Sequence, residues 1–144
     1  MFVEVIGGSS SQKKHSKSMV EFCVKKLMPR ITNLDITVRL CKPTGAMGYC
    51  LELEDNRTFE LEIDSTKPLR QLLETIAREM VHVKQYARRE LNPNNELWCG
   101  KTVDPKKVSY WDLPWEIEAH GREVGLFVRY CQENKLAKYK WTQL

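Results

Sequence analysis

The residues with the clearest chemical potential are a glutamate and a histidine three positions apart, Glu79 and His82, in a segment with helical periodicity. Side chains at this spacing project from the same face of a helix. A glutamate so placed can act as a general base, and a histidine can bind a metal ion. Zinc peptidases carry a histidine directly before the glutamate as another ligand, and this position holds Arg78. Taken alone, a histidine on a partly apolar helix is more often packed or exposed than bound to a metal.

A second group of acids and histidine follows between residues 115 and 124. Glu116 and His120 are four positions apart and therefore share one face of a predicted helix. The group could supply a further metal ligand, or it could be an acid-rich helix start that complements the helix dipole. Its members are Glu116, Glu118, His120 and Glu123.

Alternation of apolar and polar residues predicts the strands. It is weak at residues 2–6 and clear at residues 35–41. Residues 49–54 and 58–63 flank the turn at residues 55–57, which predicts a β-hairpin. We expect the apolar residues of both hairpin strands to face the core. These comprise Leu51, Leu53, Phe59, Leu61 and Ile63.

Helical spacing predicts three helices. The first begins near Ser18, which with Glu21 resembles a capping box, and ends near Pro29. The others cover about residues 69–90, with Ser65 or Thr66 as the cap, and residues 115–134. Residues 7–17 are rich in Gly, Ser and Lys and predict a loop that could be mobile.

Size and composition indicate one soluble domain over residues 1–144. The 42% of apolar residues can form a core, and the net charge of +4 is mild. Five cysteines without a Cys-x-x-Cys pair indicate free thiols in a reducing compartment. The N-terminus does not resemble a signal peptide, and no apolar run is long enough to span a membrane. We therefore expect a cytoplasmic protein with no membrane partner.

Two phrases of the sequence resemble a known family. Residues 75–86, Thr-Ile-Ala-Arg-Glu-Met-Val-His-Val-Lys-Gln-Tyr, resemble the active-site helix of small zincin-like metallopeptidases of phages and bacteria, close to the SprT-like and minimal-gluzincin groups. Residues 114–123 are similar to the third-ligand helix of that group, where Glu-x-x-Ala provides a carboxylate. The likeness covers roughly residues 69–126. It implies an α+β zincin-like domain with an N-terminal helix, a small antiparallel sheet, an active-site helix and a C-terminal helix.

The resemblance implies zinc-dependent hydrolysis of a peptide or protein substrate in the cytoplasm, which would be the host cytoplasm for a phage protein. Glu79 would activate the water, and His82 and Glu116 would bind zinc. Glu118 is the reserve for the third ligand, because the register within Trp-Glu-Ile-Glu-Ala is open. His120 would orient His82 as an outer-shell group or serve as an alternative ligand.

Arg78 departs from the family pattern, because a guanidinium presents only donors and stays charged. Three outcomes remain open. Arg78 could pair with Glu116 or Glu79 in a pseudo-enzyme, metal could bind to a rearranged set of His82, His120 and Glu116, or Arg78 could be an isolated substitution in an active lineage. Because catalytic zinc usually has three protein ligands, we expect hydrolysis to be impaired or lost.

The alternative function is a non-catalytic module that binds nucleic acid or protein on the same fold. SprT-like proteins are associated with DNA, and basic residues could contact phosphates, although they alternate with acids. These are Lys84, Arg88, Arg89, Lys101, Lys106, Lys107 and the tail residues Lys138 and Lys140. Four tryptophans could anchor a protein interface or fill the core: Trp98, Trp111, Trp115 and Trp141.

Overall fold

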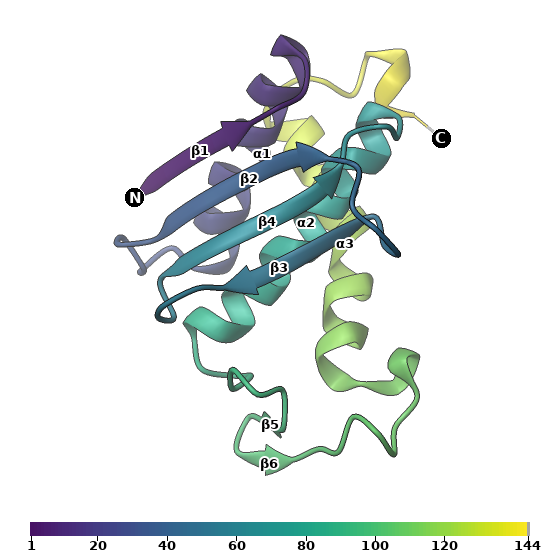
Figure 1. The fold of residues 1–144 in the computed structure, drawn as a ribbon. Coiled ribbons are helices and arrows are strands. Elements are labelled where there is room, and N and C mark those ends of the chain that lie inside the picture. Colours follow the sequence, from purple (N-terminus) through teal and green to yellow (C-terminus); the bar gives the residue numbers. More distant parts are fainter. Residues whose placement is uncertain (144) are drawn as a thin grey trace.

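Four strands form a mixed sheet of order β1-β2-β4-β3 in the computed structural model, which describes residues 1–143 (Figure 1). β1, β2 and β4 are parallel, and β3 is antiparallel to β4. The antiparallel sheet expected from the sequence is therefore wrong except for the β3–β4 hairpin. The helix between β1 and β2 returns the chain to the same end of the sheet, which makes these neighbours parallel. The strands are β1 Phe2–Ile6, β2 Asp35–Cys41, β3 Gly48–Glu52 and β4 Thr58–Asp64.

Three helices lie on one side of this sheet (Figure 1). α1 Ser10–Leu27 and α2 Leu69–Ala87 pack on the strands, and α3 Pro114–Glu133 packs mainly against α2. Short elements occupy the long connection and the tail: β5 Leu97–Trp98, β6 Lys101–Thr102, η1 Tyr110–Asp112 and η2 Lys140–Thr142. The domain is thus α+β. None of the helices in residues 1–143 is long and apolar enough to cross a membrane.

The first helix begins eight residues earlier than predicted. Ser9 caps it, and Ser9 and Gln12 form a reciprocal capping box. The lysines of the expected loop occupy exposed positions in the first turns of this helix. The loop prediction for residues 7–17 is therefore wrong from Ser10 onward, because glutamine completes a capping box as well as glutamate does.

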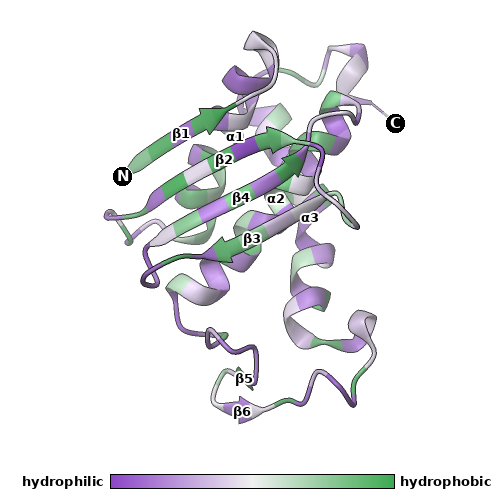
Figure 2. Cartoon of the chain, in the orientation of Figure 1, coloured by the Kyte–Doolittle hydropathy of each residue, from purple (hydrophilic) through white to green (hydrophobic). Residues whose placement is uncertain are grey.

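The core lies between the inward face of the sheet and the helices. β2 and β4 alternate between hydrophobic and hydrophilic residues (Figure 2), and their apolar residues are buried against α1 and α2. β3 differs, because its Leu51 is exposed, as is Leu53 just after the strand, contrary to the expectation that both face the core. Its inward residues are Gly48, Cys50 and Glu52. The edge strand β3 therefore turns small and polar side chains, and not large apolar ones, toward α2.

Candidate active site

α2 places three side chains of the predicted motif where this helix meets α3 and the edge strand β3. Glu79 is buried, with 4% of its surface exposed, and it lies beside Gly48 of β3. Arg78 and His82 both contact acids of α3. The helical spacing seen in the sequence thus brings these three residues to one side of α2.

His82 is held from both of its ring nitrogens. Its Nε2 lies 3.1 Å from Glu116 Oε1, and its Nδ1 lies 2.8 Å from Gln85 Oε1. The Gln85 amide nitrogen donates to the Trp115 carbonyl at 2.9 Å and to Glu118 at 3.0 Å, so its oxygen must face His82. We therefore assign a proton on Nδ1, which His82 donates to Gln85.

His82 and Glu116 form a buried charged pair. Burial alone would lower the pKa of His82, but the hydrogen bond to Glu116 and the charges of Glu79 and Glu116 raise it above its ordinary value. Burial alone would raise the pKa of Glu116, but the bond to His82 and a hydrogen bond from Tyr110 lower it. Both shifts favour imidazolium against carboxylate.

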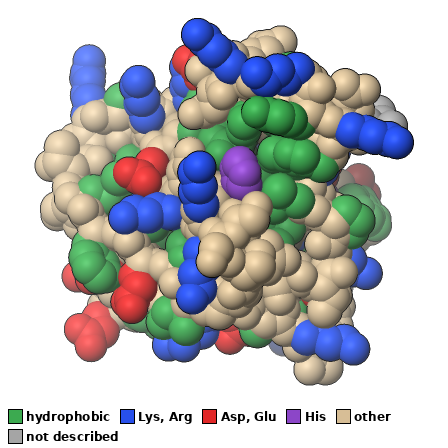
Figure 3. Space-filling model, turned by 90° about the horizontal axis from the view of Figure 1, so that it is seen from above, with side chains coloured by type: hydrophobic (Ala, Val, Ile, Leu, Met, Phe, Trp, Pro, Cys, Tyr) green, Lys and Arg blue, Asp and Glu red, His purple; other side chains and the backbone are tan. Residues whose placement is uncertain are grey.

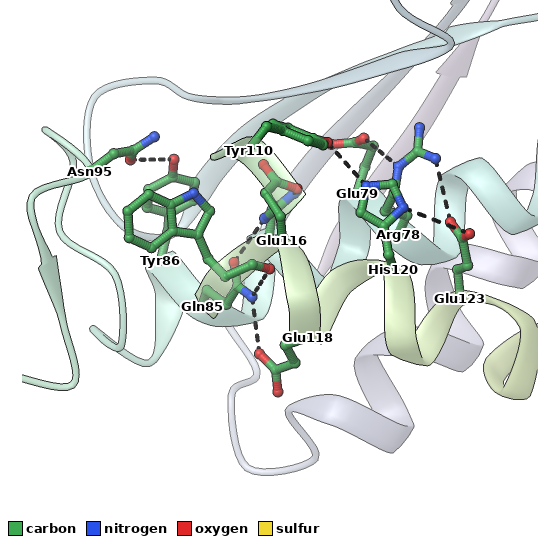
Figure 4. A network of polar contacts seen from close by, with 12 residues as sticks. Arg78, Glu79, Gln85, Tyr86, Asn95, Tyr110, Glu116, Glu118, His120 and Glu123 are labelled. Carbon is green, nitrogen blue, oxygen red and sulfur yellow. Dashed lines mark hydrogen bonds and ion pairs between the residues drawn. The ribbon is translucent and has the colours of Figure 1, made fainter. Parts of the chain in front are cut away.

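Arg78 lies between two acids (Figure 4). Its Nε is 3.4 Å from Glu79 Oε1, and its Nη1 is 3.4 Å from Glu123 Oε2. Burial raises the pKa of both carboxyls, and the positive charge of Arg78 opposes that shift. Of the two partners considered for Arg78, Glu79 is contacted and Glu116 is not. Each acid is reached by one guanidinium nitrogen, so Arg78 bridges the two acids and makes no bidentate pair with either.

Glu118, the reserve ligand, lies away from His82. It contacts Lys84 at 2.5 Å and Arg122 at 3.3 Å in addition to Gln85. Lys84, one of the basic residues that could contact phosphates, is buried, and so is Gln85. Because α2 packs closely on α3, the stem of Lys84 is covered while its ammonium group meets Glu118 and Glu90.

His120 does not orient His82 as expected. Its Nε2 lies 3.0 Å from the Tyr110 hydroxyl, and its ring lies 4.8 Å from that of Trp111, between centroids. Gln85 is the residue that fixes His82 instead. A glutamine three positions after a histidine on one helix was the available signal for this role, and Tyr110 gave no comparable signal because it lies in an irregular connection.

A cavity of about 320 Å³ opens above these residues. Gly48 allows β3 to lie this close to α2, because a Cβ there would be 2.7 Å from Thr75 Cγ2 and 3.3 Å from Glu79 Cγ. Tyr86 lines this cavity, and its hydroxyl donates a hydrogen bond to Asn95 Oδ1 at 2.8 Å (Figure 4). The lining also includes Tyr49, Cys50, His82, Tyr110, Trp115 and Glu116.

Two more cavities lie near the two ends of β3. One of about 430 Å³ lies by Glu52, Glu54 and Tyr86, beyond the C-terminal end of the strand. The other, about 380 Å³, lies by Met47 and Arg78 at its N-terminal end. The first of these shares Tyr86 with the central cavity, and residues 47–54 contribute to the lining of all three. We refer to the three cavities together as the edge cleft.

The side chains present do not fit a catalytic zinc ion. Such an ion usually takes three protein ligands, and His82 and Glu116 are two candidates in contact. The position of the usual first histidine ligand holds Arg78, whose guanidinium offers hydrogen-bond donors only and cannot bind a metal. His120, the alternative ligand, is engaged with Tyr110. Within residues 1–143, no group of three or more His, Cys, Asp or Glu side chains is arranged to hold a metal. The roles of His82 and Glu116 as ligands stay predictions.

Comparisons with known proteins add no family assignment. No protein-family model matches the chain, and neither the curated proteins nor the solved structures contain a match. The likeness of the two helices to zincin-like peptidases therefore remains an expectation from the sequence.

The charged pair predicts that the protein loses the stabilising contribution of His82 as the pH rises through the folded-state pKa of this residue, which lies above 6.5. The pKa of His82 is raised above 6.5 in the folded state, so its contribution is complete below that pH and is lost as the pH passes the folded pKa. Urea unfolding at a series of pH values should show this slope, and His82→Gln should remove it. His15 and His120, whose pKa values burial lowers, are common to both proteins and cancel in the difference. Equal slopes would contradict the charged pair.

Proposed function

We propose that this chain is a zincin-like domain that binds an extended peptide in the edge cleft without hydrolysing it. The two-phrase resemblance supports the zincin-like assignment. The α+β arrangement is compatible with it, since the helix carrying Glu79 lies beside an edge strand and faces a later helix carrying Glu116. The loss of hydrolysis is argued from Arg78.

The observation that carries the proposal is the pairing of Arg78 with Glu79 and Glu123. The guanidinium supplies positive charge to buried acids at the point where the first metal ligand would project. Glu79 is thereby engaged in an ion pair instead of facing a metal-bound water. His82 and Glu116 balance each other's charge and hydrogen-bonding capacity in their own ion pair. The polar groups of the site are thus compensated by the chain's own residues.

Peptide binding is supported by the position of β3. Its outer edge has no neighbouring strand in the described chain, so its backbone groups can pair with an added strand. The edge cleft runs beside residues 47–54, which extend roughly 26 Å at about 3.3 Å per residue. This length suits a peptide segment of about seven or eight residues, whose alternate side chains would enter the cavities.

The test uses a library of fluorescent decapeptides selected on the unmodified protein. We expect selected peptides to bind, to remain intact by mass spectrometry, and to bind at least about tenfold more weakly to Gly48→Ala. The added methyl group would meet Thr75 and Glu79 and force β3 away from α2. Gly125→Ala is the matched control, since nothing lies within 4 Å of its added Cβ. Cleaved peptides, or equal binding by both variants, would contradict the proposal.

A second candidate function, nucleic-acid binding, is favoured by the basic end of the domain (Figure 3). The ring of His15 in α1 packs at a tilt of 59° against that of Trp141 in the tail, with 5.1 Å between centroids, and this contact joins two lysine-rich segments. Among residues 1–143, no carboxylate lies within salt-bridge distance of Lys13, Lys14, Lys17, Lys138 or Lys140. A labelled oligonucleotide in the same binding assay separates the candidates, because phosphate contacts must weaken steeply as salt rises.

A further inference from the structure

The face of α3 turned away from α2 carries an exposed apolar stripe. Ile117, Val124 and Val128 are 57%, 46% and 39% exposed, and Gly121 lies between them along the same line of the helix. An added Cβ on Gly121 would meet nothing within 4 Å. Single exposed apolar residues are ordinary, but an unbroken stripe over three turns of a surface helix is not.

The order of residues in this stripe is self-complementary. Ile117 and Val128 lie at its ends, and Gly121 and Val124 lie between them, with spacings of four, three and four residues. If a second α3 runs in the opposite direction, Ile117 faces the partner's Val128. The partner's Val124 then enters the open space above Gly121. A glycine opposite a branched side chain allows two helices to approach closely.

The charges beside the stripe favour the same arrangement. Glu118 and Arg129 lie on one flank of it, near opposite ends. In an antiparallel pair, Glu118 approaches the partner's Arg129, and the contact occurs twice by symmetry. In a parallel pair, two-fold symmetry would place the two copies of Glu118 on opposite flanks of the contact, so this pairing with Arg129 would not form. Glu118 already accepts from Lys84, Gln85 and Arg122, and a carboxylate has about four acceptor positions, so one remains for this contact.

We propose that two copies of this chain associate through α3, antiparallel about a two-fold axis between Gly121 and Val124. We choose a second copy as the partner for this stripe, because the chain itself supplies both the apolar and the charged residues that would match it. The stripe spans about 16 Å at about 1.5 Å per residue. That is short for a stable interface, which buries about 800 Å² per partner. We therefore expect a reversible dimer and not a permanent one.

Sedimentation equilibrium of the unmodified protein from micromolar to millimolar concentrations tests this proposal. We expect a monomer–dimer equilibrium that Val124→Glu weakens at least about tenfold by placing a charge in the contact. Leu51→Glu is the matched control, because Leu51 is similarly exposed, at 42%, on the far face of the sheet. A monomer at all concentrations, or equal effects of the two variants, would overturn the proposal.

Cysteine cross-linking tests the direction of the helices independently of any destabilisation by Val124→Glu. Cys99 is the exposed native thiol and is first replaced by serine. In this background, a mixture of Ile117→Cys and Val128→Cys proteins should form the mixed disulfide in preference to either symmetric one. Preferred symmetric disulfides would indicate a parallel pair and overturn the antiparallel arrangement. Oxidation without any cross-link, at concentrations where dimer is present, would show that another surface associates.

Discussion

Arg78→His is expected to raise the affinity for zinc by more than about 100-fold and to give the protein peptidase activity. The substitution replaces a cation with an imidazole that can join His82 and Glu116 as a third ligand. The loss of an outer-shell partner alone costs 10–100-fold in metal affinity, so restoring a direct ligand should exceed that. It also removes the ion pair that engages Glu79, which leaves its carboxylate able to act as a base.

The measurement is competition of each protein with a chromophoric zinc chelator, followed by an assay on labelled casein. Arg122→His is the matched control, since it makes the same change at a position on α3 that pairs with Glu118 and is 41% exposed in its side chain. It should gain neither zinc nor activity. If Arg78→His binds zinc no better than this control, the assignment of α2 as a degenerate metal-binding helix is wrong.

In the Arg78→His background, Glu116→Gln should remove most of the gained zinc affinity, by about 100-fold or more. Glu116 lies 3.1 Å from His82 Nε2 and so is placed to share a ligand set with it. Glu118→Gln should cost less than about tenfold, because Glu118 acts on His82 only through Gln85. The pair of variants makes the same change two residues apart.

The same zinc competition assay decides the register of the third ligand. A large loss with Glu118→Gln and a small one with Glu116→Gln would contradict the geometry described above. Comparable losses with both would indicate that the effect passes through the packing of α2 on α3. The unfolding transition of each variant should therefore be measured alongside zinc binding.

Local signals in the sequence predicted most of the elements but not how they pair. The start of α3 was predicted to within one residue. Pro114 and the periodic apolar residues after it mark this start clearly. The hairpin turn at residues 55–57 was equally clear. The parallel direction of β1, β2 and β4 depends on pairing between distant segments, and no local pattern encodes it. Leu51 was misplaced because alternation does not say which face of an edge strand is buried.

The two residues at the centre of the site, His82 and Glu116, could be named from the sequence. The residues that hold them in place could not. The resemblance placed Glu116 opposite His82, and the two are in contact. The role of Gln85 was not predicted, because it depends on two partners supplied by α3, Trp115 and Glu118. The choice of Glu123 as a partner for Arg78 likewise follows from how the two helices pack. Such contacts need the crossing of α2 and α3, which periodicity does not provide.

The most direct test of the account is the zinc content of the unmodified protein after incubation with excess zinc and removal of free metal. Elemental analysis beside Arg78→His should find far less than one zinc per chain in the unmodified protein. The variant should retain about one. If the unmodified protein retains one zinc per chain, and Glu116→Gln removes it, then Arg78 does not fill the metal position and the proposed non-hydrolytic role is contradicted.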